Sequence, residues 1–267
     1  EELQGYSSNY LFSGDLKYEN IGSYFMDHNF QHVEDEKVFP SHLKRGKLNY
    51  FDSDLYALLL KKMNSTKEPF LHCAFTGSTH APYDHPKSKN PRFKGEEADY
   101  MNSMVYADKC LGDFIANCRT KAWFKNTIFV FVSDHGHPAP GMSNPNSKVF
   151  FRIPFLIWGE ELKETYRGKI NDKIGSQADI AATLLYQLGG NLKKFPWSKD
   201  LLNPNCPEFA LLAINRGYGW VSKKGHYVYQ MDSKIELENS FLKKDQKEEI
   251  NNCNAFLTRF YKDFKEL

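Results

Sequence analysis

Residues 129–137 read Phe129-Val130-Phe131-Val132-Ser133-Asp134-His135-Gly136-His137, an apolar run that passes directly into polar residues. A short apolar run of β-branched and aromatic residues bounded by turn formers predicts a buried strand. In open α/β sheets the carboxyl ends of the strands border the ligand crevice, so we expect the side chains of Asp134 and His135 at a site. The stretch therefore predicts an α/β fold with chemistry at a strand end.

The pair Asp134 and His135 has the chemistry of a metal site. A carboxylate offers a hard oxygen and an imidazole offers a nitrogen, which together suit Mn²⁺ or Zn²⁺, and Mg²⁺ where water completes the coordination sphere. The alternative is a capped turn, in which Asp134 accepts hydrogen bonds from loop amides and the histidines are solvated. The four residues Ser133 to Gly136 leave both interpretations open.

A second predicted strand also ends in a histidine. Residues 70–83 read Phe70-Leu71-His72-Cys73-Ala74-Phe75-Thr76-Gly77-Ser78-Thr79-His80-Ala81-Pro82-Tyr83. We expect Pro82 to keep His80 in an extended loop, where an imidazole can hold an oxyanion or protonate a leaving group. A structural hydrogen-bonding role is the alternative for His80, as it is for His72 and His85. We predict that His80 and the Asp134–His135 pair converge in one crevice.

The rest of the sequence alternates short apolar runs with amphipathic stretches of helical length, the pattern of a sheet covered on both faces. Strands are predicted at 8–12, 70–75, 127–133, 154–158, 210–215 and 226–230. Helices are predicted at 52–63, 97–118, 177–188 and 243–267. Asp52 and Ser53 are candidate caps of the first helix, and residues 191–207 are expected to form a surface loop.

Composition narrows the function classes. Thirty-five Lys and Arg against thirty-three Asp and Glu give a formal net charge of +2, which is too balanced for a nucleic-acid footprint or a polybasic membrane anchor. No apolar run approaches the roughly 20 residues of a transmembrane helix. The five cysteines form no C-x-x-C pair and are expected to be buried or partly buried free thiols. The substrate must be decided by local chemistry.

The motifs in their order resemble a known family. They are T-x-S-x-H-x-P-Y at 76–83, W-x-x-N-T-x-x-V-x-x-S-D-H-G at 123–136, R-I-P-x-L-I-W at 152–158 and Q-x-D-I-A-A-T-L-L at 177–185, preceded by a glycine-containing segment at 12–25. This arrangement is similar to the lipoteichoic acid synthase-like branch of the alkaline phosphatase/sulfatase superfamily, in the form common in Bacteroidetes-type bacteria. The resemblance runs from Gly5 to the last predicted helix.

The resemblance implies roles for individual residues. Asp134 and His135 match the Asp-His metal ligands of the family, which would hold one divalent ion, Mn²⁺, Zn²⁺ or Mg²⁺. His80 matches the histidine that contacts the substrate phosphate, and it is our candidate catalytic residue. His137 is a candidate substrate contact, with a solvated loop histidine as the alternative. Asp15 is a weaker candidate for substrate binding, as is Asn20, whereas Asp179 is better explained as a helix cap.

One family element is not found in this sequence. Family enzymes use a metal-bound Thr or Ser nucleophile, or a modified residue in C/S-x-P-x-R in true sulfatases, early in the domain, and we assign no nucleophile here. We therefore expect a fragment, residues 1–267 being the C-terminal portion of a sulfatase-like catalytic domain in which 190–267 can form a small C-terminal subdomain. The expected fold is an alkaline-phosphatase-like α/β/α sandwich with a mostly parallel central sheet, its N-terminal part missing.

The implied function is a divalent-metal-dependent phosphoryl transferase or hydrolase acting on phosphate esters such as glycerophosphate lipid headgroups. By resemblance the catalytic domain lies outside the cytoplasm at the cell membrane, any membrane anchor belongs to the missing part, and the fragment itself is inactive. A sulfatase acting on sulfate esters is one alternative, and a non-catalytic sulfatase-like binding domain is another. Loss of early strands would expose a sheet edge, through which the chain could associate.

Overall fold

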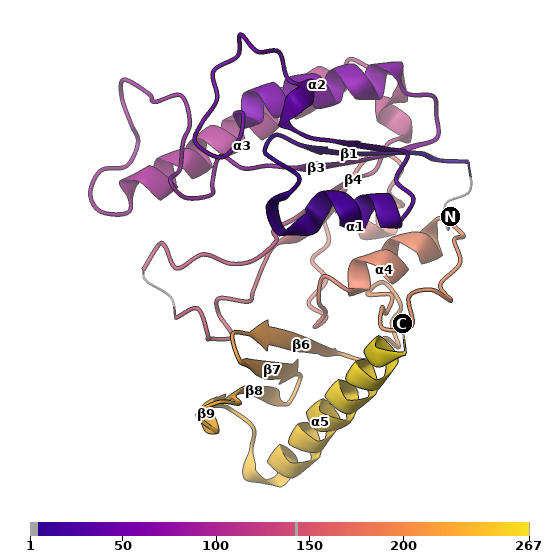
Figure 1. The fold of residues 1–267 in the computed structure, drawn as a ribbon. Coiled ribbons are helices and arrows are strands. Elements are labelled where there is room, and N and C mark those ends of the chain that lie inside the picture. The colour runs from indigo at the N-terminus through magenta and orange to yellow at the C-terminus, as the bar shows by residue number, and fades with distance from the viewer. Residues whose placement is uncertain (1–4, 142–143, 267) are drawn as a thin grey trace. The chain divides into compact units, whose positions relative to one another are not determined.

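The computed structural model describes residues 5–141 and 144–266, and the chain divides into two compact units. The first unit runs to Ile128 and also includes Gly159–Glu161. The second comprises Phe129–Trp158 and the chain from Leu162 onward. Each unit is a set of strands and helices with its own packing, so the two are described in turn (Figure 1).

The first unit is built on a parallel three-stranded sheet. Its order is β2 (His32–Glu34), β1 (Ser7–Phe12), β3 (Phe70–Phe75), and Phe12 pairs with Phe75 at the carboxyl ends of β1 and β3. Helix α1 (Ile21–Asp27) lies on one side of this sheet, and α2 (Asp52–Ser65) and α3 (Ala98–Cys118) lie on the other (Figure 1). The expected α/β/α layering is confirmed in this unit.

Buried apolar side chains and one ion pair join the sheet of the first unit to helix α2. Leu11 of β1 and Leu55 of α2 are fully buried. Glu34 of β2 accepts hydrogen bonds from Lys62 of α2 at 2.6 Å and from Asn9 of β1 at 2.8 Å. Burial alone would raise the pKa of Glu34, but these two partners lower it below its ordinary value, so the carboxylate stays charged.

The second unit begins with the strand predicted from residues 129–137. Strand β4 (Phe129–Val132) pairs antiparallel with β5 (Phe155–Trp158), and the rings of Phe129 and Trp158 lie 5.3 Å apart. A parallel pair needs a long crossover, usually a helix, and the described residues between β4 and β5 form turns. The chain therefore returns antiparallel here, whereas the first unit is parallel.

An antiparallel meander and two helices complete the second unit. Strands β6 (Phe209–Ile214), β7 (Gly217–Ser222), β8 (Gly225–Gln230) and β9 (Ile235–Asn239) pair in sequence order. Helix α5 (Lys243–Lys265) packs on this sheet through a core of Trp220, Tyr227, Phe241 and Cys253 (Figure 1). Helix α4 (Asp179–Gln187) precedes the meander. The short 3-10 helices are η1 (Tyr18–Asn20), η2 (Glu36–Val38), η3 (Ala122–Asn126) and η4 (Glu164–Tyr166).

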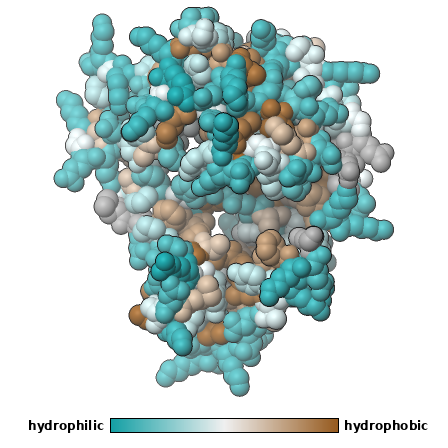
Figure 2. Space-filling model, in the orientation of Figure 1, coloured by the Kyte–Doolittle hydropathy of each residue, from teal (hydrophilic) through white to brown (hydrophobic). Residues whose placement is uncertain are grey.

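Most of the face shown in Figure 2 is hydrophilic, and hydrophobic residues form patches within it. Large exposed hydrophobic residues include Val132 and Leu156 on β4 and β5, and Tyr261 and Phe264 near the end of α5. In the described parts of the chain, no helix combines the length and the apolar character that crossing a bilayer requires. The described cysteines are free and buried or partly buried, as expected, and burial raises the pKa of the Cys73 thiol to about 11.

Candidate functional site

The sharpest candidate site follows β4 directly. The Asp134 carboxylate accepts the backbone N–H of His135 through Oδ1 at 2.8 Å. Its other oxygen, Oδ2, lies 3.4 Å from Nε2 of His135, and the two side chains are 52% and 61% exposed. The strand end thus presents a carboxylate oxygen and an imidazole nitrogen side by side, in reach of solvent.

The hydrogen bonds of His135 determine which ring nitrogen carries the proton. Nδ1 lies 2.6 Å from the carbonyl oxygen of Gly136, and because a carbonyl can only accept, Nδ1 must donate. In the neutral ring Nε2 then carries the lone pair that faces Asp134. Two acceptors at this separation suit a shared cation, since bonds of about 2.0–2.1 Å at a tetrahedral angle put two ligand atoms roughly 3.3 Å apart.

The pair by itself is an incomplete metal site. No group of three or more His, Cys, Asp or Glu side chains is arranged to hold a metal ion within residues 5–141 and 144–266. The donor set fits a divalent ion in type and spacing, but two protein ligands hold a cation weakly.

Two contacts fix the backbone around this pair. A Cβ atom added at Gly136 would lie 1.9 Å from the carbonyl oxygen of Phe150, so only glycine fits at this close approach. On the other side, the amide nitrogen Nε2 of Gln177 donates to the carbonyl oxygens of Ser133 and Asp134, each at 2.7 Å. No local sequence pattern predicted this contact of Gln177.

His137 lies in the same loop with the opposite ring arrangement. Its Nδ1 accepts the backbone N–H of Ala139 at 3.0 Å and lies 3.4 Å from the Ala139 carbonyl oxygen, and the shorter contact favours the neutral ring with its hydrogen on Nε2. An Nε2–H group suits donation to an anionic oxygen better than ligation of a metal. That His137 contacts the substrate stays a prediction.

His80 lies at a strand end of the first unit, after β3. The prediction of an extended loop is wrong, because His80 donates its N–H to Gly77 and its carbonyl accepts from Tyr83, which closes two consecutive turns. Nδ1 of His80 lies 2.8 Å from the carbonyl oxygen of Ala81 and must donate to it, so Nε2 carries the lone pair in the neutral ring. The side chain is exposed, and Nε2 can accept a hydrogen bond.

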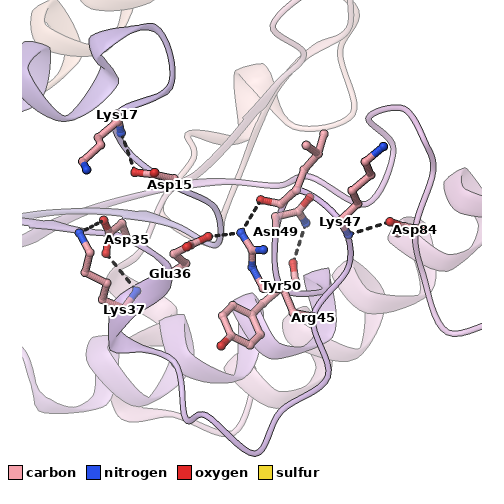
Figure 3. Close-up of polar contacts among 11 residues, drawn as sticks. Asp15, Lys17, Asp35, Glu36, Lys37, Arg45, Lys47, Asn49, Tyr50 and Asp84 are labelled. Carbon is pink, nitrogen blue, oxygen red and sulfur yellow. Dashed lines mark hydrogen bonds and ion pairs between the residues drawn. The ribbon is translucent and has the colours of Figure 1, made fainter.

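Residues 45–52 hold the His80 loop at both ends. Oδ1 of Asp52 accepts the backbone N–H groups of Gly77 and Ser78, both at 3.1 Å. At the other end, the Asp84 carboxylate accepts the N–H of Lys47 at 2.8 Å (Figure 3). Asp52 was a candidate helix cap, whereas its carboxylate supports the loop that carries His80.

Asp15 and Asn20 lie beyond the carboxyl end of the neighbouring strand β1. Oδ1 of Asp15 accepts the N–H of Lys17 at 2.9 Å and so closes a turn (Figure 3). Glu19 and Asn20 both have positive φ angles, 49° and 57°, in the left-handed region that costs energy for side chains other than glycine. Because β1 and β3 are parallel neighbours, Asp15 and His80 follow the same edge of one sheet.

Asp179 has a different role from the predicted helix cap. The helix begins at Asp179 itself, and the residue in the capping position is Ala178, which makes no side-chain cap. The Asp179 carboxylate is buried and accepts the backbone N–H groups of Ser176 at 2.8 Å and Lys199 at 3.0 Å, with an ion pair to the Lys199 ammonium. It anchors the loop before α4 to the loop after it.

Comparison with known proteins identifies the family. The model of the family described as Sulfatase matches residues 2–190, and the chain therefore belongs to the sulfatase family. The fold is alkaline-phosphatase-like: a protein of the alkaline phosphatase superfamily from Vibrio parahaemolyticus superposes with a TM-score of 0.79 at 23% identity, over 97% of this chain and 66% of that one.

Two curated relatives carry names that describe an activity. Phosphoglycerol transferase I of Xanthomonas campestris is 25% identical over 81% of this chain and 32% of its own length. Lipoteichoic acid synthase of Staphylococcus aureus is 22% identical over 100% of this chain and 46% of its own length. The chain thus spans less than half the length of either relative. Asp134, His135 and His80 all lie within the residues matched by the family model.

Proposed function

We propose that the chain is the metal-binding part of an enzyme that transfers or hydrolyses the phosphoryl group of phosphate esters, such as glycerophosphate lipid headgroups, outside the cytoplasmic membrane. The observation that supports this most is the approach of the Asp134 carboxylate to Nε2 of His135, at 3.4 Å. The names of the relatives, phosphoglycerol transferase and lipoteichoic acid synthase, support the substrate class.

In this proposal Asp134 and His135 bind one divalent ion, which would neutralise charge on the transferring phosphoryl group. His80 contacts a phosphate oxygen and exchanges a proton at Nε2, and His137 donates its Nε2–H to the anionic substrate. Asp15, at the same sheet edge as His80, borders the substrate. The proposal requires that the His80 loop and the Asp134–His135 loop meet in the active enzyme.

A sulfate-ester hydrolase is the second candidate, and the match to the sulfatase family model favours it. Sulfate and phosphate esters both present anionic tetrahedral groups, so the metal pair and the histidines suit either. Assays of the complete protein that contains this chain, with p-nitrophenyl phosphate and p-nitrophenyl sulfate in parallel, would separate the two.

The metal role is testable on the 267-residue chain by calorimetric titration with Mn²⁺ or Zn²⁺. We expect weak binding that is lost in both Asp134→Ala and His135→Ala. His226→Gln is a matched control, because His226 also lies beside a carboxylate, with its Nε2 3.2 Å from Glu238. Its Nδ1, however, faces the Ser240 hydroxyl, which unlike a carbonyl can donate and so leave the ring hydrogen on Nε2, where it would block a metal. Unchanged binding in both site variants, or equal loss in the control, would contradict the proposal.

A further inference from the structure

A side chain from the loop before α4 binds the backbone at the candidate metal pair, and the proposed function gives this contact no role. The side chain of Gln177 spans from this loop to the end of β4, where its Nε2 lies 2.7 Å from two successive carbonyl oxygens, those of Ser133 and Asp134. A side-chain amide carries two hydrogens on this nitrogen, so each carbonyl receives its own donor.

These two carbonyl groups belong to the two peptide units that flank the Cα atom of Asp134. Peptide units are planar, and the backbone direction at a residue is set by the rotations φ and ψ between its two flanking units. An interaction that holds both units therefore fixes φ and ψ of Asp134, and with them the direction of its Cα–Cβ bond. Gln177 thus sets the direction in which the Asp134 side chain leaves the backbone, without touching its carboxylate.

Gln177 is itself held by a buried anchor. Two residues further along, the Asp179 carboxylate is 1% exposed and binds the N–H of Ser176 as well as the N–H and ammonium groups of Lys199. The backbone that carries Gln177 is therefore fixed on its N-terminal side by Asp179 and on its C-terminal side by α4. The residue that contacts the backbone of Asp134 is therefore itself anchored by a buried carboxylate.

We propose that Gln177 is a positioning residue of the metal site, which orients Asp134 toward His135 by clamping the peptide groups on either side of it. This inference rests on the proposed role of Asp134 and His135 as metal ligands. Residues that do not touch the metal but hydrogen-bond to its ligands and orient them typically contribute about 10- to 100-fold to metal affinity. The side chain of Gln177 is exposed, so water can replace its hydrogen bonds, but water does not fix the orientation that the two bonds impose.

The test compares Gln177→Met, which keeps the length of the side chain but has no donor, with Gln177→Glu, which directs a carboxylate at two carbonyl oxygens. Gln187→Met is the matched control, an exposed glutamine at the C-terminal end of α4, the helix that follows Gln177. In the 267-residue chain we expect Mn²⁺ or Zn²⁺ affinity to fall about tenfold or more in Gln177→Met and further in Gln177→Glu. Gln187→Met should bind like the wild type.

A second readout does not depend on metal. Amide hydrogen exchange at residues 133–137 should become faster in both Gln177 variants, while the exchange of β6–β8 and the melting temperature stay as in the wild type and in Gln187→Met. Wild-type metal affinity and unchanged exchange at 133–137 in both Gln177 variants would overturn the clamp. If Asp134→Ala still abolishes metal binding in that case, the proposed function survives without the clamp. If the wild type binds no metal, the proposed function fails. Faster exchange in the Gln177 variants would then support only the clamp on the backbone.

Discussion

The carboxylate of Asp52, buried at the start of α2, accepts the backbone N–H of Ser78 at 3.1 Å, and the Ser78 hydroxyl accepts the N–H of Asp52 in return, also at 3.1 Å. The same carboxylate oxygen accepts the N–H of Gly77. This reciprocal pair joins the beginning of a helix to the loop that carries His80. The geometry of the candidate catalytic histidine therefore depends on a residue that is far from it in the sequence.

Replacing Asp52 separates its role as a hydrogen-bond acceptor from its charge. Asp52→Ala leaves the buried N–H of Ser78 and the partly buried N–H of Gly77 without this acceptor, so we expect the free energy of unfolding to fall by about 2–4 kcal/mol. Asp52→Asn keeps an oxygen acceptor and should lose roughly 1 kcal/mol or less. Urea denaturation measures both, and equal losses in the two variants would show that the contact to the loop does not matter.

Gly136→Ala is expected to disturb the candidate metal pair, because the new methyl group would lie 1.9 Å from the carbonyl oxygen of Phe150 and both are backbone-fixed. The loop must move, and metal affinity should drop together with stability. Gly112→Ala is the control: Gly112 lies within α3 with nothing within 4 Å of the added atom, so it should stabilise the helix by about 0.5–1 kcal/mol. Calorimetric titration and thermal melting of both variants test this, and a Gly136→Ala protein with wild-type affinity would contradict it.

His72 predicts a dependence of stability on pH. Burial, with a smaller contribution from nearby Lys62, lowers the pKa of His72 to about 4 from an ordinary value near 6.5. Between pH 6.5 and 4 the unfolded chain therefore takes up a proton that the folded chain does not, so stability is fully present above pH 6.5 and is lost as the pH falls toward 4. This loss should amount to at most about 3 kcal/mol.

The pH dependence is measured by urea denaturation at several pH values in the wild type and in His72→Gln, which stays neutral. The free energy of unfolding of the wild type should fall relative to that of His72→Gln as the pH is lowered from 7 to 4. His42→Gln, at an exposed position, should keep the pH profile of the wild type. A His72→Gln profile parallel to the wild type would show that His72 does not titrate in this way.

Glu249 of α5 predicts a stability effect in the second unit. Its carboxylate accepts the ring N–H of Trp220 at 3.0 Å; burial alone would raise its pKa, but hydrogen bonds from Trp220, Ser222 and Lys224 lower it. Glu249→Leu leaves the Trp220 donor buried without this acceptor, so we expect a loss of about 1–3 kcal/mol in the free energy of unfolding. The neighbouring Glu248 is 64% exposed, and Glu248→Leu should change the free energy of unfolding by less than about 0.5 kcal/mol. Tryptophan fluorescence during urea unfolding measures both.

The elements that the sequence predicted correctly are those with a strong local pattern. Strand β3 and helices α2, α3 and α5 begin within a residue of the predicted positions, because their hydrophobic periodicity is continuous. Residue 267, the predicted end of the last helix, lies outside the described residues.

The elements that were missed have a weak or misleading local pattern. Strand β7 contains Gly217 and Gly219, which disfavour strand formation, yet a Cβ atom at Gly217 would lie 2.3 Å from the carbonyl oxygen of Tyr229, so the pairing of the strands requires glycine. Strand β9 is an exception, because its alternation of Ile and Leu with Glu residues does predict a strand and was overlooked, whereas β2 is only three residues long. Helix α1 has seven residues and no side-chain cap.

The candidate site shows the same division. Asp134 and His135 were predictable because they are adjacent in the sequence and follow a recognisable strand, and the structure brings their side chains together. The supporting roles of Asp52 and Gln177 were not, because each binds backbone groups more than twenty residues away, and no local spacing reveals such partners. That His80 meets the Asp134–His135 pair stays a prediction.

The meander β6–β9 has consequences for the order in which the chain acquires its structure. Each of its strands pairs with the next one along the chain, so its hairpins form by closing short loops. Strand β1, in contrast, pairs with β3 only after the intervening helices have been spanned, as the partnership of Asn9 with His72 shows. Because contacts between distant segments are slow to form, we expect the C-terminal meander to gain protection early in refolding and the parallel sheet to follow.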